Sequence, residues 1–253
     1  MSTYQDVVNA SLALEAWALT EASGTDFAPY TGSVHLTGAG VNQYQQAGPN
    51  ASMLALHLNP GKLTTATNLP FTKWFTMEAW FHIDSTARAG NCLLMYLGGN
   101  SGANGWGIYI APGSNAIHLF WANPVRDITT GVVLPANQWH LLQIGNLSGA
   151  TGEMDLAFDG QVIAQDITPN SQTAPSGGYG FGGDNTFASN YPGLISMPAV
   201  YVTQQSALAW FSRFQAVADP NAAILNSLTG PGQTVAGGSG ILSQILASVR
   251  KTY

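Results

Sequence analysis

Charged side chains are scarce in this sequence. Only 8% of its 253 residues are Asp, Glu, Lys or Arg, against about 25% in an average globular protein. Thirteen acidic and seven basic residues leave a formal net charge of −6, which argues against nucleic acid as a partner because binding nucleic acid needs a basic surface. So neutral a surface fits a β-rich extracellular or virion protein, or a surface largely covered by other subunits.

Cysteine and long apolar runs are scarce as well. The single cysteine, Cys92, precedes the apolar run 93–97, which predicts a buried thiol without a catalytic role. No apolar run reaches the roughly 18 residues that a membrane-spanning helix needs, so no membrane contact is expected. The first residues lack a basic segment and are interrupted by Asp6, which is not the pattern of a secretory signal.

Motifs for metals and nucleotides are also lacking. The sequence has no His-Glu-x-x-His, no Cys-x-x-Cys, no calcium loop and no Walker loop, so neither a metal nor a cofactor is predicted. Its five histidines lie far apart in sequence, which leaves only a site assembled by the fold: His35, His57, His82, His118 and His140.

What the sequence does contain is the pattern of short β-strands. Residues 76–83 alternate, with Met77, Ala79, Phe81 and Ile83 on one side and Thr76, Glu78, Trp80 and His82 on the other. This period of two predicts a strand with one face in a core. Further short strands are expected at 106–111, 116–122, 139–144 and 153–158. Asp159-Gly160 predicts a two-residue hairpin turn, and such closely spaced strands and turns indicate a sandwich.

Four blocks of sequence, in order, resemble laminin-G-like domains of the concanavalin-A-like superfamily. They are residues 15–24, 69–83, 138–160 (Gln-Trp-His and the following hairpin) and 191–201. The resemblance covers roughly 15–216 and implies an all-β, concanavalin-A-like (laminin-G-like) jelly-roll sandwich with short N- and C-terminal helices. The acidic pair that the family often carries in its closing strand is replaced here by Ser196-Met197.

Helical patterns flank the predicted sandwich. Residues 4–14 read as a short helix, and Ser206 is a candidate N-cap for a helix through Val217 with Leu208, Phe211 and Phe214 near one face. A further short helix is possible at 221–228. The predicted organisation is an N-terminal helical segment (1–15), a laminin-G-like jelly roll (16–203), packing helices (204–228), a Gly-rich linker (229–240) and a C-terminal amphipathic docking helix (241–253).

The C-terminal segment is the strongest candidate for protein docking. Five of the twelve residues in 229–240 are Gly, which is typical of a flexible tether. Beyond it, aliphatic residues repeat at helical spacing. We expect them to dock either on their own domain or in a groove of a neighbouring protein. The predicted docking residues are Ile241, Leu242, Ile245, Leu246 and Val249.

A second candidate site is a glycan-binding loop. Flat aromatic rings cover the apolar faces of sugars, and amides bind their hydroxyls. The Gly- and Asn-rich segment 98–106 and the strands that follow it offer this mixture, although aromatic residues on sandwich strands are often core. The candidate glycan-binding residues are Asn100, Asn104, Trp106, Tyr109 and Trp121.

Catalysis is not expected from the carboxylates. Glycosidases of the laminarinase type in this superfamily carry a third carboxylate on the strand that bears their Glu-x-Asp. Here Ala157 and Phe158 occupy the two positions after Glu153-x-Asp155 where that third carboxylate could stand. Glu153 and Asp155 are therefore interpreted as the solvent face of an edge hairpin. The sequence therefore predicts no catalytic residues and no enzymatic activity.

Two functions remain open at the level of sequence. A laminin-G-like domain without an export signal or a disulfide fits a phage protein that folds in the host cytoplasm and is located in the virion. The leading hypothesis is a structural protein of a phage particle (a head decoration, collar, tail or fibre component), present in repeated copies or as a homo-oligomer and packed against other virion structural proteins. The alternative is an adhesin or receptor-binding module for a cell-surface glycan.

Overall fold

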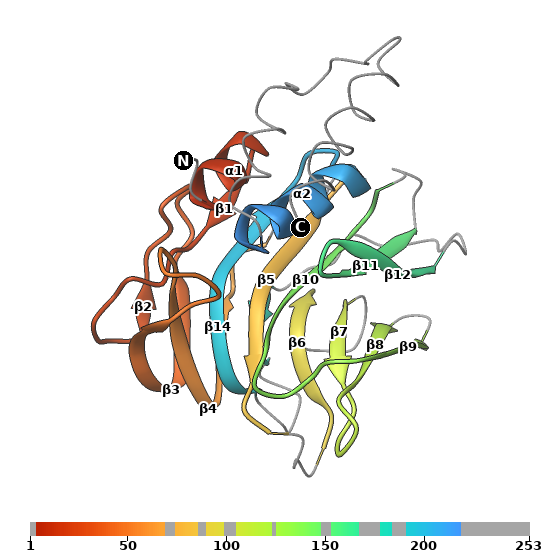
Figure 1. The fold of residues 1–253 in the computed structure, drawn as a ribbon, viewed down its shortest axis with the longest axis horizontal. Helices are drawn as coiled ribbons and strands as arrows, with labels where there is room; N and C mark the ends of the chain where they lie inside the picture. Colours follow the sequence, from red (N-terminus) through yellow and green to blue (C-terminus); the bar gives the residue numbers. More distant parts are fainter. Residues whose placement is uncertain are drawn as a thin grey trace, which may run out of the picture.

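The computed structural model describes residues 4–68, 74–85, 90–98, 105–122, 125–147, 153–166, 178–183 and 191–218. Within these residues the chain forms two helices and many short strands (Figure 1). Their bounds, in chain order, are α1 Tyr4–Ala10, β1 Glu15–Ala16, β2 Asp26–Phe27, β3 Leu36–Ala47, β4 Leu54–Thr65, β5 Thr76–Ile83, β6 Cys92–Leu97, β7 Trp106–Ile110, β8 Ala116–Ala122, β9 Val125–Val133, β10 Trp139–Gly145, β11 Met154–Phe158, β12 Gln161–Asp166, β13 Tyr179–Phe181, β14 Tyr191–Tyr201 and α2 Ala207–Ala218.

The strands form a sandwich of two layers that share one long strand. The order along the sheet is β12-β11-β10-β5-β14-β4-β13-β6-β7-β8-β9. The first half of β4 pairs with β14 and its last residues pair with β13, so β4 passes from the first layer, β12 to β14, into the second layer, β13 to β9 (Figure 1). This confirms the expected jelly-roll sandwich.

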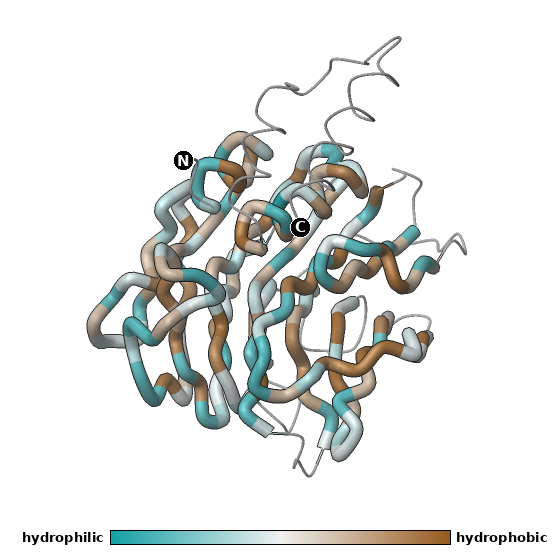
Figure 2. The backbone as a smooth tube through the Cα atoms, in the orientation of Figure 1, coloured by the Kyte–Doolittle hydropathy of each residue, from teal (hydrophilic) through white to brown (hydrophobic). Residues whose placement is uncertain are grey.

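The alternation in β5 correctly identified the core. Met77, Ala79, Phe81 and Ile83 lie in the main apolar core, and alternating apolar and polar segments are visible along other strands (Figure 2). The thiol of Cys92 is buried there, as expected. The Asp159-Gly160 turn is also confirmed, because both residues have positive φ (52° and 75°) between β11 and β12.

The two helices lie side by side on the outer face of the first layer, across one end of β5 and β14 (Figure 1). The N-terminal helix ends at Ala10, earlier than the expected residue 14, because Leu12 adopts a positive φ of 59°. The predicted N-cap of α2 is confirmed, since the Ala209 N–H donates to Ser206 Oγ. None of the described helices is long and apolar enough to cross a membrane.

The buried side of α2 differs from the side expected from its apolar spacing. Leu208 and Phe211 are 68% and 38% exposed, whereas Trp210, Arg213 and Ala216 are buried. The helix is rotated so that Arg213 reaches a buried carboxylate on β5. Residues 219–253 fall outside the described part of the chain, and with them the possible helix 221–228, the linker and Ile241, Leu242, Ile245, Leu246 and Val249.

Candidate carbohydrate-binding surface

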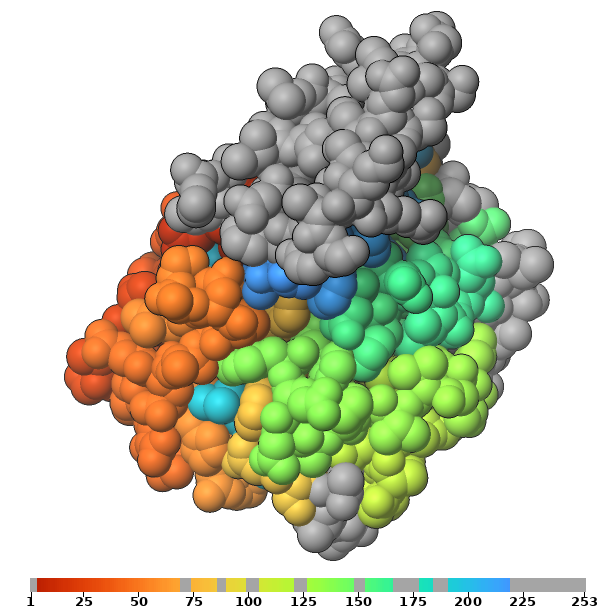
Figure 3. Space-filling model, viewed as in Figure 1, coloured from red at the N-terminus to blue at the C-terminus, as the bar shows by residue number. Residues whose placement is uncertain are grey.

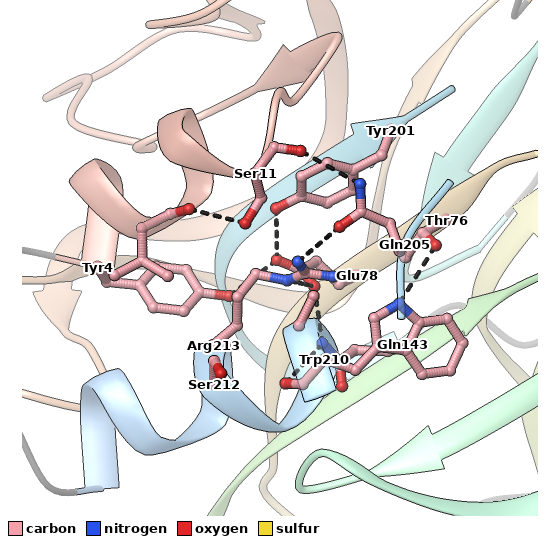
Figure 4. A network of polar contacts seen from close by, with 12 residues as sticks. Tyr4, Ser11, Thr76, Glu78, Gln143, Tyr201, Gln205, Trp210, Ser212 and Arg213 are labelled. Atoms are coloured by element: carbon pink, nitrogen blue, oxygen red, sulfur yellow. Dashed lines mark hydrogen bonds and ion pairs between the residues drawn. The ribbon is translucent and has the colours of Figure 1, made fainter. Parts of the chain in front are cut away.

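A buried ionic network fixes both helices to the sheet (Figure 4). Arg213 Nε donates to Glu78 Oε2 at 2.6 Å, and neither side chain is exposed. The hydroxyls of Tyr4 and Tyr201 donate to Glu78 Oε1 at 3.1 and 2.8 Å. Gln143 Nε2 donates to the other oxygen at 2.9 Å. We call these five residues the helix clamp.

The surroundings of the helix clamp raise the pKa values of three of its residues. Burial, and then the Glu78 carboxylate, raise the pKa of Tyr4 and of Tyr201 well above the ordinary tyrosine value. Burial alone would lower the pKa of Arg213, but Glu78 raises it overall. Because the clamp is closed to solvent, its role is to hold α1 and α2 in place.

The outer face of β5 changes from closed to open along its length. Residues two apart on a strand share a face, so Glu78, Trp80, His82 and Asp84 follow one another along it. Glu78 and Trp80 are buried beneath the helices. The side chains of His82 and Asp84 are 20% and 39% exposed. The helices therefore leave the far end of this face accessible.

Strand pairing assembles a cross-strand row at this open end. Side chains of directly paired residues lie on the same face of a sheet. The pairs run from β3 through β4, β14 and β5 to β10, and we call them the histidine row: Gln43, His57, Leu194, His82 and Trp139. Figure 3 shows this region below the blue α2, where cyan atoms of β14 are visible between orange β3–β4 and the green segment that leads into β10.

The polar groups of the histidine row are held in defined orientations. His57 Nε2 donates to Asp84 Oδ2 at 2.7 Å, and Asn42 Nδ2 donates to His57 Nδ1 at 3.3 Å. These two bonds engage both ring nitrogens of His57 and fix the orientation of its imidazole. His82 Nδ1 lies 3.9 Å from Asp84 Oδ1 and is buried without a hydrogen-bond partner among the described residues.

An indole borders these groups. The rings of Trp139 and His82 lie 5.4 Å apart with an interplanar angle of 55°. Trp139 and Leu194 are both partly exposed. Together with Asp84, the row therefore presents an aromatic ring, two imidazoles, a carboxylate and an amide on one accessible strip, which is the combination expected of a surface that binds sugar rings and their hydroxyls.

Of the five glycan-binding residues expected from sequence, the structure describes the side chains of Trp106 and Tyr109, and both are buried. Trp106 is only 2% exposed and packs in the core against Phe75, with ring centroids 3.9 Å apart. Its indole cannot stack on a sugar, so that expectation is corrected. Trp121 pairs with Trp106 in the sheet, but its side chain lies outside the described part, as do Asn100 and Asn104.

Tyr109 points away from the core on the second layer, where its polar partners satisfy it. Its hydroxyl donates to Asp127 Oδ2, and His118 Nδ1 donates to Asp127 Oδ1 at 2.9 Å. The rings of Tyr109 and His118 stack at 4.6 Å. Burial, and then the hydrogen bond to Asp127, raise the pKa of Tyr109. Since Tyr109 is itself only 8% exposed, this group is mainly structural.

The Glu153–Asp155 strand differs from its interpretation as a solvent-facing hairpin. Asp155 is buried, and it accepts hydrogen bonds from the Leu147 N–H at 2.9 Å and from Gln165 Nε2 at 2.7 Å. Its carboxylate therefore anchors neighbouring segments. Among the residues that the structure describes, no group of three or more His, Cys, Asp or Glu side chains could hold a metal ion.

Sequence reasoning missed the histidine row because its members are distant in sequence. The alternation in β5 already placed His82 opposite the core. Nothing in the local sequence indicates that His57 on β4 and Trp139 on β10 flank it. The one signal for Trp139 is the Gln138-Trp139-His140 block, which predicts a strand and resembles the family but does not indicate which residues lie beside it.

Solved structures with a similar fold include parts of carbohydrate-active proteins. A sialidase of Trypanosoma rangeli has a TM-score of 0.63 at 12% identity, covering 82% of this chain and 33% of the sialidase. Domain 4 of the arabinanase AbnA of Geobacillus stearothermophilus, in complex with arabinotriose, has a TM-score of 0.59 at 13% identity, covering 80% of this chain and 98% of that domain. The chain thus spans about a third of the sialidase's length and nearly all of the arabinanase domain.

A toxin domain shares the fold too. The botulinum neurotoxin type G receptor binding domain has a TM-score of 0.54 at 12% identity, covering 80% of this chain and 51% of that chain. These identities show a common fold and no more.

The comparisons correct one expectation. Because a sialidase and an arabinanase are among the structural neighbours, the prediction that this chain has no enzymatic activity is wrong. The missing third carboxylate on the Glu153–Asp155 strand excludes one arrangement of catalytic groups, whereas the fold is compatible with both an enzymatic and a binding role.

Sequence comparison identifies the family. No curated protein sequence matches this chain significantly. A family profile described as the concanavalin A-like lectin/glucanases superfamily matches residues 58–208, a segment that runs from β4 into α2 and contains most of both sheet layers. On this match, which covers more than half of its length, the chain belongs to the concanavalin A-like lectin/glucanase superfamily.

Proposed function

We propose that this domain binds carbohydrate on the histidine row. The observation that carries the proposal is the partly exposed Trp139 ring beside His82 and the Asp84 carboxylate, on the end of the first layer that the helices leave open. The arabinotriose bound to the arabinanase domain of similar fold supports a sugar as the ligand.

The chemistry of the row suits a sugar in two ways. The Trp139 indole offers an apolar face for the CH groups of a sugar ring. Asp84, held by His57, offers fixed acceptor oxygens for hydroxyls, and a fixed acceptor loses little conformational freedom on binding. Shallow surfaces of this kind gain affinity from several weak contacts rather than from one deep pocket.

Replacing the indole tests the proposal. In calorimetric titrations with soluble oligosaccharides chosen from a glycan array, Trp139→Ala should weaken binding by about five- to tenfold, the worth of one aromatic contact. Phe211→Ala is the matched control, because it removes a partly exposed ring from the outer side of α2 and should leave affinity unchanged. Unaltered binding by Trp139→Ala, or no glycan bound by the unaltered chain, would overturn the proposal.

The composition of the chain and its C-terminal segment support a second role. We propose that the domain is a structural component of a phage virion, anchored to other virion proteins by residues 241–249. Supporting this are the few charged residues and the Gly-rich linker, together with α2, which the helix clamp fixes to the sandwich directly before residue 219. A tether that starts from a fixed point raises the local concentration of its partner.

Truncation tests the virion role. Deleting 229–253 should leave the Tm of the domain nearly unchanged, since the described sandwich and its clamp are retained. The truncated chain, and Leu246→Asp, should be missing from purified particles that contain the full chain. A large drop in Tm on truncation would instead show that the segment packs on its own domain, and normal incorporation of both variants would rule out the anchor.

A further inference from the structure

The geometry of the histidine row points to the class of its ligand. Building on the carbohydrate-binding role proposed above, we infer that the row takes a neutral, unbranched glycan that lies across the strands, and that it discriminates against acidic sugars such as sialic or uronic acids. Four observations carry this inference: the direction of the row, the helix layer beside it, the position of Asp84 and the arrangement of donors around Asp84.

The direction of the row sets the path of the ligand. Its members occupy five adjacent strands, from Gln43 on β3 to Trp139 on β10. Adjacent strands lie about 4.8 Å apart, so the row extends for about 19 Å. A sugar unit in an extended chain advances by about the same distance as one strand spacing. The row therefore matches a straight chain of about four units, one above each gap between strands.

The side of the row that faces α2 limits branching. Along β5 toward α2, the next residue on the outer face after His82 is Trp80, which is covered by Phe214 with the two rings stacked at 6.0 Å. The edge of the helix layer therefore runs alongside the row. A substituent pointing toward α2 would meet this layer, whereas an unbranched chain can lie beside it.

The charge of the row sets its preference for neutral sugars. Asp84 lies near the middle of the row with 39% of its side chain exposed. The chain as a whole carries a formal charge of −6. Two unit charges 4 Å apart repel by about 1 kcal/mol even in bulk water and by more near a protein surface, so a ligand carboxylate placed over Asp84 should lose at least about fivefold in affinity.

The groups around Asp84 favour a hydroxyl as the atom it binds. Oδ2 already accepts from His57, whereas His82 Nδ1 lies 3.9 Å from Oδ1, beyond hydrogen-bond distance. Buried polar atoms without partners are uncommon and often mark functional positions, and His82 Nδ1 is one, facing this carboxylate. A sugar hydroxyl can donate to Oδ1; a ligand carboxylate at neutral pH cannot.

The test is a titration series with the full chain. Neutral linear oligosaccharides of one to six units are compared with matched chains that carry one sialic or uronic acid. We expect affinity to rise with length up to about four units and then level off, and the acidic chains to bind at least about fivefold more weakly. Asp84→Asn should remove most of this difference while it keeps the shape of the site.

A matched charge removal is the control. Asp26→Asn removes one negative charge from another His–Asp pair, between Asp26 and His35, and should leave the discrimination unchanged. Tighter binding of acidic chains, or an affinity that is already maximal for a single unit, would overturn the inference while leaving carbohydrate binding intact. Absence of binding to every glycan would instead defeat the proposed function itself.

Discussion

Removing one partner from the buried Glu78–Arg213 pair should destabilise the domain strongly. Arg213→Met keeps an unbranched side chain of similar length but leaves the Glu78 carboxylate buried with neutral donors alone, from Tyr4, Tyr201 and Gln143. Breaking one side of a fully buried pair typically costs about 3–5 kcal/mol. Loss of the guanidinium over the Tyr201 ring, 4.6 Å from its centroid, adds about 1 kcal/mol or less.

Replacing both charges separates the ionic contribution from packing. Glu78→Gln alone leaves Arg213 as an uncompensated buried cation, so it should also cost about 3–5 kcal/mol. In the double variant neither charge remains buried, and the loss should be smaller than the sum of the two single losses by at least roughly 2 kcal/mol. The measurement is the free energy of unfolding from urea titrations, followed by tryptophan fluorescence and circular dichroism.

The control for the clamp is on the same helix. Leu208→Ala removes an apolar side chain that is 68% exposed, so it should change the free energy of unfolding by less than about 0.5 kcal/mol. If Arg213→Met cost less than about 1 kcal/mol, or if the single losses simply added, the clamp would not hold α2 as described. A larger loss from Leu208→Ala than from Arg213→Met would mean that α2 packs by the other face.

Three further predictions concern the same domain. Phe81→Ala should lower the free energy of unfolding by about 3–5 kcal/mol, measured by urea titration, because the ring is fully buried in the main core. Gly160→Ala should cost more than Gly113→Ala in the same assay: both have a φ of 75°, but a Cβ at Gly160 would lie 2.7 Å from Phe211 Cα, whereas nothing lies within 4 Å at Gly113. Equal losses would contradict the close contact between α2 and the β11–β12 turn. Finally, the pKa values of Tyr4 and Tyr201 are raised in the folded state, so their contribution to stability is complete below about pH 10 and is lost as pH rises further. Tyr4→Phe should reduce the alkaline loss of stability, and an unchanged pH profile would refute this.

Local sequence patterns identified several elements correctly, each through a short-range cause. The alternation in β5 placed Phe81 in the core, the Asp159-Gly160 pair marked a hairpin, and Ser206 marked the start of α2. Each of these depends on residues within one turn or one strand. The side of α2 that is buried could not be read in this way, because Arg213 is drawn inward by Glu78, 135 positions away.

The candidate site shows the same limit more clearly. Sequence reasoning selected aromatic residues near a Gly- and Asn-rich loop, and Trp106 among them is in the core. Whether an aromatic side chain on a strand faces the core or the solvent depends on how that strand pairs with its neighbours. Bulges shift the pairing by one residue at several places, including between Leu93 and Met95 on β6, the strand next to Trp106. One-residue shifts exchange the two faces of a strand.

Local patterns in the sequence predicted the strands, the sandwich and the helix that follows it, because alternation, turn residues and caps act over a few residues. The jelly-roll form was implied by the resemblance to laminin-G-like domains. Contacts between residues far apart in sequence place two helices over one end of the first layer and leave the other end open. The fold also brings together His57 from β4, His82 and Asp84 from the end of β5, and Trp139 from β10. The physical reason is that a row across a sheet is set by strand order and register, which are properties of the whole chain.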